Sequence, residues 1–222
     1  RNFWQNYPKD LVVSSQGIEL GICPTLKKNE YAEAQGTVDE HRLYYYLQDG
    51  FYKFRQGVTK THDIWLEVQE SGSGKAATVR SQHSPFIASV AAEWYAASNA
   101  FNVLAVPKRT GILGQYDTSF ERSFKRYLNN RETNREYGML NFGDWWGERG
   151  INWGNSEYDT QHAFLLQFLR KGDPRYFQAA EEMEWHNRDI DTVNYHTDRS
   201  RIGGVYQHCI GHTGDYYSES PV

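Results

Sequence analysis

The sequence predicts an α+β multidomain protein in which part of an antiparallel β-sandwich (residues 1–92) precedes a helical part (residues 93–222). In the first half, apolar and polar residues alternate, as in "GIELGI" at 17–22 and "DIWLEV" at 63–68, which is typical of half-buried strands. In the second half, apolar residues recur at helical spacing. Short turns join the expected helices, which favours repeated α/α hairpins.

The alternating pattern predicts strands at 17–22, 43–47, 51–54 and 63–68. Asp49-Gly50, between the second and third of these runs, favours the tight primed turn of a β-hairpin. The segment "ESGSGKAA" at 70–77 is expected to be a flexible connection between the two halves.

The first long helix is expected within "DTSFERSFKRYLNNRETNREYG". Thr118 and Glu121 have the spacing of a capping box, in which each side chain satisfies a backbone N–H at the start of a helix. Gly138 is a natural C-terminal cap, because glycine readily adopts the left-handed conformation that ends helices.

Two further helices are predicted as an antiparallel pair. The first starts with Asp159 or Thr160 as N-cap and stops at Gly172. The second starts at once, with Asp173 as N-cap and Pro174 in its first turn. Its helical pattern continues to about Val193.

Composition and charge exclude several classes of function. The formal net charge is -4, and no Lys/Arg-rich run forms the basic patch of a nucleic-acid-binding protein. No apolar run approaches the roughly 18 residues that span a membrane. Aromatic residues make up 15% of the chain, which fits a protein that stacks sugars on aromatic rings. The two cysteines, Cys23 and Cys209, lack the spacing of a thiolate zinc site.

One segment combines aromatic, polar and glycine residues in an unusual density. "NFGDWWGERGINWGNSEYD" at 141–159 is expected to be a long loop between two helices, and long ordered loops are usually functional. Trp146 and Trp153 offer flat faces for sugars. Arg149 can grip a carboxylate in bidentate fashion, and Asn155 can donate a hydrogen bond to the same group.

Ionisable side chains follow this segment. Tyr158 lies four residues before His162, which is expected in the first turn of a helix and therefore able to face the loop. His208 and His212 lie four residues apart in "YQHCIGHTGDYY". They lack the glutamate and the helix of the zinc-protease pattern, so a histidine-bound zinc is not expected. A calcium ion held by carboxylate oxygens stays open.

Two chemistries fit these residues. Glycoside hydrolysis needs two carboxylates, and Asp144 with Glu148 or Glu157 would supply them. β-Elimination next to a uronate instead needs groups that neutralise the carboxylate, remove the C5 proton and protonate the departing oxygen. Asn, Arg, His and Tyr suit those roles. Composition alone does not separate the two, and a glycan-binding protein without activity is a third alternative.

Several motifs resemble one family. The run "NFGDWWGERGINWGNSEYDTQHAFLLQFLRKGDPRYF" is similar to the exo-rhamnogalacturonan lyase family (polysaccharide lyase family twenty-six and its bacterial relatives). The resemblance extends to "FWQNYPKDL", "GIELGICP", "GVTKTHDIWLEV", "EWYAASNAF" and "GGVYQHCIGHTGDYY" in the same order. It implies a central β-sandwich followed by an α/α toroid. The chain would be a segment of a longer protein that holds the end of the sandwich and the first helices of the toroid.

The resemblance also implies cleavage of rhamnogalacturonan I at the rhamnose–galacturonate bond, leaving an unsaturated galacturonate. Chemical reasoning on the matching motifs then assigns the roles. Arg149 and Asn155 would hold the uronate carboxylate, and Tyr158 and His162 would be base and acid in either order. The expected catalytic set is Asn155, Tyr158, His162 and His212; the expected substrate-binding set is Arg149, Trp146, Trp153, Glu148 and His208. The expected partner is a polysaccharide or oligosaccharide, and the expected location is secreted or periplasmic.

Overall fold

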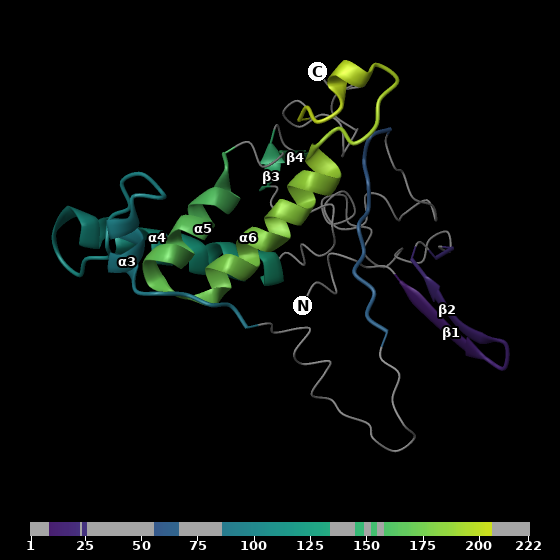
Figure 1. Ribbon diagram of the computed structural model, residues 1–222, viewed down its shortest axis with the longest axis horizontal. Coiled ribbons are helices and arrows are strands. Elements are labelled where there is room, and N and C mark those ends of the chain that lie inside the picture. The colour runs from purple at the N-terminus through teal and green to yellow at the C-terminus, as the bar shows by residue number, and fades with distance from the viewer. Residues whose placement is uncertain are drawn as a thin grey trace.

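The computed structural model describes residues 9–22, 24–25, 56–66, 86–133, 145–148, 152–154 and 158–205. Its elements, in order, are β1 (Asp10–Ser14), β2 (Gly17–Gly21), α3 (Ala92–Ser98), α4 (Gly111–Thr133), β3 (Trp145–Glu148), β4 (Asn152–Gly154), α5 (Thr160–Lys171) and α6 (Pro174–His186). A π-helical turn at Asn187–Asp191 and a 3₁₀ turn at Arg199–Arg201 follow. Figure 1 shows the long helices gathered together and the β1–β2 hairpin projecting from the rest. None of the described helices is long and apolar enough to cross a membrane.

The first half contains one hairpin in its described part. Strands β1 and β2 pair antiparallel from Asp10 opposite Gly21 to Ser14 opposite Gly17. Gly17 has a φ of 143°, which explains a glycine directly after the turn. The strand predicted at 17–22 is thus confirmed over 17–21. Its alternation buries neither face, because Ile18 remains 72% exposed.

The strand predicted at 63–68 is wrong over its described part, because residues 63–66 form neither strand nor helix. Ile64, Trp65 and Leu66 are exposed, and alternation gives only a preference until a partner strand supplies hydrogen bonds. Each sheet in the described part has two strands. The strands predicted at 43–47 and 51–54, the 70–77 connection, Gly138 and both cysteines lie outside the described residues.

Helix α4 begins well before the capping box expected at Thr118 and Glu121. Thr118 lies inside the helix, where its hydroxyl donates to the carbonyl of Gly114 at 2.8 Å. A threonine often bonds back to the preceding turn in this way, so the capping-box prediction is wrong. Glu121 has a different partner, because it accepts a hydrogen bond from Tyr176 Oη at 2.7 Å.

The turn between α5 and α6 confirms its prediction. Gly172 ends α5 in the left-handed conformation, with φ 68° and ψ 10°, and its N–H donates to the carbonyl of Phe168 at 2.7 Å. Asp173 then caps α6 by accepting from the backbone N–H of Arg175 at 3.0 Å. Pro174 is the first residue of α6. This two-residue connection turns the chain back and makes α5 and α6 antiparallel neighbours, as Figure 1 shows.

The helical segment that begins at Pro174 continues to Asp191, close to the predicted limit at Val193, but its last part is π-helical. After His186 the backbone widens into the π-helical turn, and the N–H of Thr192 donates to the carbonyl of Asn187 at 2.9 Å. Asp191 in this turn is buried, with its carboxylate 3.4 Å from Nε2 of the buried His186. The wider turn therefore ends the helix while keeping these polar groups together inside.

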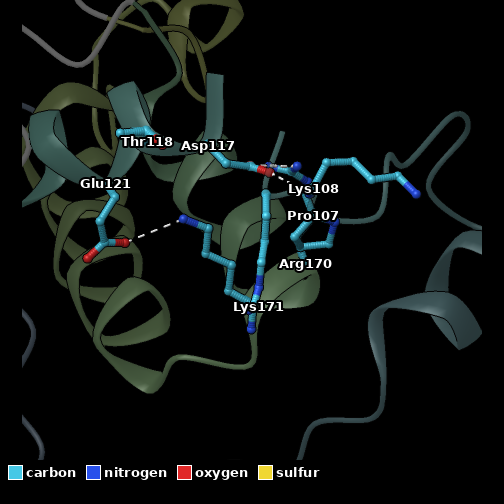
Figure 2. A pocket seen from close by; sticks show the side chains of 8 residues that line it. Pro107, Lys108, Asp117, Thr118, Glu121, Arg170 and Lys171 are labelled. Carbon is cyan, nitrogen blue, oxygen red and sulfur yellow. Dashed lines mark hydrogen bonds and ion pairs between the residues drawn. The ribbon is translucent and has the colours of Figure 1, made fainter. Parts of the chain in front are cut away.

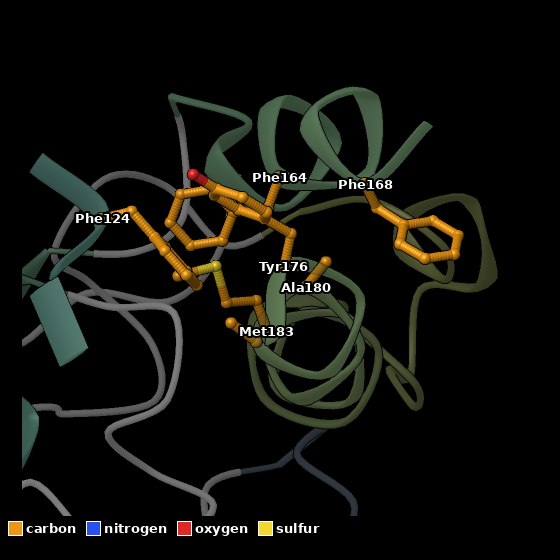
Figure 3. Close-up of a cluster of buried hydrophobic side chains, with 7 residues drawn as sticks. Phe124, Phe164, Phe168, Tyr176, Ala180 and Met183 are labelled. Atoms are coloured by element: carbon orange, nitrogen blue, oxygen red, sulfur yellow. The ribbon is translucent and has the colours of Figure 1, made fainter. Parts of the chain in front are cut away.

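The core is an aromatic cluster shared by α4, α5 and α6. Phe124 stacks on Tyr176 with ring centroids 4.0 Å apart and meets Phe164 edge-on at 5.0 Å. Phe124 is 1% exposed and Tyr176 is 0% exposed. Figure 3 shows these rings converging with Met183 between the helices. Burial of such rings is the main stabilising contribution, so the cluster fixes α4 against the α5–α6 pair.

Segment 56–66 is attached to the π-helical turn. The N–H of Thr59 donates to the carbonyl of Asp189 at 2.8 Å. Thr61 donates to the carboxylate of Asp189 through its N–H at 2.7 Å and through its hydroxyl at 3.0 Å. Asp189 is 4% exposed, and a buried carboxylate needs such donors. The helical part thereby holds a piece of the first half by specific polar contacts.

We expect Phe124→Ala to lower the free energy of unfolding by about 3–5 kcal/mol, because it removes a buried ring and leaves a cavity. Phe86→Ala is the matched control, since Phe86 is fully exposed and its loss should change stability by less than about 0.5 kcal/mol. Urea denaturation measures both. Equal effects of the two variants would contradict the assignment of the core.

His62, within the attached segment, predicts a pH dependence. Among the residues that the structure describes, neither of its ring nitrogens has a hydrogen-bond partner. Burial, and then the charges of Lys9 and Lys60, lower the pKa of His62 from 6.5 to about 4, against the opposing effect of Asp189. Between those values the unfolded chain binds more protons than the folded one, so the free energy of unfolding falls as the pH falls from about 6.5 to about 4.

We therefore expect His62→Phe to reduce the loss of stability over that pH range, because phenylalanine does not titrate. Urea denaturation of both proteins at several pH values measures this. A variant that loses stability as steeply as the unsubstituted protein would show that other groups cause the dependence.

Candidate functional site

The aromatic segment contains a short β-hairpin, which the sequence analysis did not foresee. Strands β3 and β4 pair antiparallel, with Trp145 opposite Gly154 and Trp146 opposite Trp153. An irregularity follows Trp146, after which Glu148 lies opposite Asn152. The backbone register thus brings together two of the tryptophans expected to bind sugar. Figure 1 shows the hairpin near the end of the helix pair where α5 begins and α6 ends.

The hairpin is connected closely to the start of α5. Tyr158 lies four residues after Gly154, so their Cα atoms are at most about 14 Å apart. The side chain of Tyr158 is exposed, with 73% of the residue accessible to solvent. His162 lies in the first turn of α5, as predicted, and is also exposed. Both expected proton-transfer groups are therefore accessible at one end of the helix pair.

Asp159 precedes α5 in an unusual conformation. Its φ is 53° and its ψ is 41°, which places it in the left-handed region, and its side chain makes no capping hydrogen bond. An aspartate at this position usually accepts a hydrogen bond from the first turn. Here Oδ2 of Asp159 lies instead 3.0 Å from Nδ1 of His162. The prediction of Asp159 as N-cap is right in position and wrong in its side-chain contact.

A second carboxylate faces this region from α6. Glu184 lies near the end of α6, which runs antiparallel to α5, and so comes level with the first turn of α5. Burial, and then the charge of Asp159, raise the pKa of Glu184, while His162 lowers it. Nothing in the sequence around Glu184 indicates this role, because only the antiparallel packing of α5 and α6 brings it near His162. Two carboxylates and one imidazole therefore share this end of the helix pair.

The other expected site residues lie outside the described part of the structure. They are Arg149, Asn155, His208 and His212, together with the carboxylates Asp144 and Glu157 of the hydrolase alternative. Their roles stay predictions. In the described ranges, no group of three or more His, Cys, Asp or Glu side chains is placed to hold a metal ion.

A pocket lies at the opposite end of the helix pair. It has a volume of about 570 Å³, and its lining residues are Pro107, Lys108, Arg109, Asp117, Thr118, Glu121, Arg170 and Lys171. Figure 2 shows Lys171 reaching toward Glu121 and Arg170 reaching toward Asp117. Arg170 pairs with Asp117 at 2.7 Å and Lys171 with Glu121 at 3.4 Å. Because these charged side chains pair with one another, they are suited to holding α4 against α5. Lys171 lies nine residues beyond His162, about 14 Å along the helix axis.

The conformation of Asp159 predicts how substitutions there affect stability. Glycine and asparagine adopt the left-handed region readily, whereas alanine is strained in it by about 1–2 kcal/mol. We expect Asp159→Ala to be less stable than Asp159→Gly by about 1 kcal/mol, despite the greater flexibility of glycine in the unfolded chain. Thermal and urea denaturation measure the difference. A more stable alanine variant would contradict the left-handed conformation.

Comparisons with known proteins place this geometry in a family. Residues 85–219 match the family model described as the PcRGLX-like protein C-terminal alpha/alpha toroid domain. A search of curated proteins gave no match. The matched region contains the helices α3 to α6, the β3–β4 hairpin and the end of the helix pair with Tyr158 and His162. The chain therefore belongs to the PcRGLX-like proteins and carries their C-terminal α/α toroid domain.

Proposed function

We propose that the protein is a polysaccharide lyase that cleaves a uronate-containing glycan, with rhamnogalacturonan I as its substrate, by β-elimination. The observation that carries the proposal is the exposed pair Tyr158 and His162 at the start of α5, in a toroid domain of this family. A tyrosine and a histidine can provide the acid and the base that an elimination needs. Both must be accessible to act on a polymer, and both are.

The β3–β4 hairpin supports a glycan substrate. Its register places Trp146 opposite Trp153 in a ladder that leads into α5 within a few residues. Tryptophan rings give the flat apolar surface on which sugars stack. In the proposal these two residues, with Glu148, bind sugar next to the proton-transfer groups.

Arg149 and Asn155 complete the proposed reaction. In the sequence, Arg149 directly follows β3 and Asn155 directly follows β4. Neutralising the uronate carboxylate makes the proton at C5 more acidic, and a guanidinium with an amide donor suits this role. His208 and His212 are proposed to contribute from a later segment. The reaction needs no redox cofactor, and we propose calcium only as an auxiliary to carboxylate binding.

The wider organisation is proposed on the same basis. Residues 1–92 would be the last part of a central β-sandwich, and residues 93–222 would be the first part of the toroid. We propose a secreted or periplasmic location, where the enzyme would meet its polymeric substrate. The net charge of -4 offers no attraction to nucleic acid or to an anionic membrane surface.

The test is the ultraviolet absorbance of the unsaturated uronate during incubation with rhamnogalacturonan I. We expect the absorbance to rise, and His162→Ala and Asn155→Ala to slow the rise at least about tenfold. His196→Ala is the control and should keep the original rate. His196 accepts a local hydrogen bond from the N–H of Asp198 at 2.9 Å.

Each outcome of this assay distinguishes between the candidate functions or residue roles. Reducing sugar without the new absorbance would overturn elimination and favour hydrolysis by Asp144 and Glu157. Binding without any product would overturn enzymatic activity on this glycan. If both variants keep the original turnover, the roles of His162 and Asn155 are wrong even if elimination occurs. Added EDTA should leave the rate unchanged unless calcium takes part.

A further inference from the structure

The contact between Asp159 and His162 determines which nitrogen of the imidazole is available. Nδ1 of His162 lies 3.0 Å from Oδ2 of Asp159. A carboxylate only accepts hydrogen bonds, so Nδ1 carries the proton in this pair. The neutral imidazole then has its lone pair on Nε2. The side chain of His162 is 61% exposed, which leaves it accessible to a ligand.

The backbone of Asp159 is fixed in a way that favours this contact over capping. Its carbonyl accepts the hydrogen bond from the N–H of Ala163 at 3.2 Å, so it is tied into the first turn of α5. Asp159 has a left-handed conformation, and its side chain makes no capping hydrogen bond to the first turn of α5. A capping contact of this kind contributes about 0.5–2 kcal/mol. Asp159 makes the contact with His162 in place of that contribution.

A second carboxyl group lies near this contact. Asp159 is in direct contact, and Glu184 faces the same turn from α6. Burial and the Asp159 charge raise the pKa of Glu184, and His162 opposes them. Asp159, in direct contact with Nδ1, is therefore the carboxylate that can position the ring of His162.

We infer that Asp159 is a positioning residue that holds His162 with Nε2 as the proton acceptor, so that His162 is the base and Tyr158 the acid. This inference rests on the proposed function. Nε2 removes the proton from C5 of the uronate, and the electrons of that C–H bond form the double bond between C4 and C5. The bond from C4 to the glycosidic oxygen breaks, and this oxygen takes the proton of Tyr158. Proton transfer from His162 to the tyrosinate, through water, restores both groups.

The arrangement is a familiar solution in other enzymes. A carboxylate bound to Nδ1 fixes the tautomer of a catalytic histidine and stabilises its charged form, while Nε2 reacts. Partners of this kind typically change activity by about 10–100-fold. The present case differs in that carboxylate and imidazole belong to one helix start, three residues apart, and a left-handed residue brings them together.

Two substitutions test the effect of the Asp159 carboxylate separately from the effect of its backbone conformation. Asp159→Asn and Asp159→Gly both tolerate the left-handed conformation, so they remove the charge without the strain that alanine would add. We expect kcat on rhamnogalacturonan I to fall at least about tenfold in each, with KM changed less than about twofold. Glu93→Gln, which removes an exposed carboxylate in the first turn of α3, is the control and should leave both unchanged.

Nitrogen NMR of histidine-labelled protein reads the tautomer directly, without substrate. The signals of His162 are assigned by their loss in His162→Gln. We expect the proton of neutral His162 on Nδ1 in the unsubstituted protein, and a shift toward the Nε2-protonated tautomer in Asp159→Asn. The double variant Asp159→Asn/His162→Ala should be no slower than His162→Ala, because Asp159 acts through His162.

The outcomes distinguish the inference from the proposed function. Elimination in the unsubstituted protein, together with undiminished kcat in Asp159→Asn, would overturn the inference alone. A proton on Nε2 of neutral His162 in the unsubstituted protein would also overturn it. A double variant much slower than His162→Ala would show that Asp159 acts separately. No elimination at all, with the tautomer as expected, would overturn the proposed function and leave the Asp159–His162 contact established.

Discussion

The stacking of Phe124 on Tyr176 is the contact on which the rest of the structure depends. It joins the middle of α4 to the first turn of α6, with ring centroids 4.0 Å apart, and Phe164 of α5 closes the cluster from the side. The same tyrosine donates its hydroxyl proton to Glu121 at 2.7 Å. This hydrogen bond lowers the pKa of Glu121 more than any other contact, and burial raises that of Tyr176. One residue thus anchors both the apolar core and its polar edge.

Because the helix pair is anchored in this way, its two ends have different electrostatic character. At the turn end, Arg170 and Lys171 lie against Asp117 and Glu121, so opposite charges are close enough to neutralise one another. At the other end, Oδ2 of Asp159 lies 3.0 Å from Nδ1 of His162, and Glu184 lies nearby on α6. Charges paired across helices hold those helices together, whereas the contact between Asp159 and His162 lies within one helix start. The difference in pairing, more than the presence of charge, distinguishes the two ends.

Local signals in the sequence were sufficient for the helix pair. Gly172, Asp173 and Pro174 each have one strongly preferred role at a helix end, and all three occupy it. The capping box predicted at Thr118 is wrong. The motif shows only that these side chains are able to cap a helix start, and α4 already begins at Gly111. The strand at 63–68 failed for a related reason. Alternating apolar and polar residues show that a segment is able to form a strand. The strand forms only if a partner strand is present, and the periodicity of the sequence does not identify that partner.

Prediction from the sequence has the same limit for individual residues of the candidate site. His162 could be selected from the sequence, because its place in the first turn of a helix follows from the residues around it. Its relation to Asp159 could not, since an aspartate before a helix normally caps it, and only the left-handed backbone turns the carboxylate toward the ring. The proximity of Glu184 was still harder to predict from the sequence, because Glu184 is 22 residues away in the chain from His162. The arrangement of Asp159, His162 and Glu184 thus depends on one backbone torsion and on the packing of α6 against α5, and the aromatic core fixes that packing.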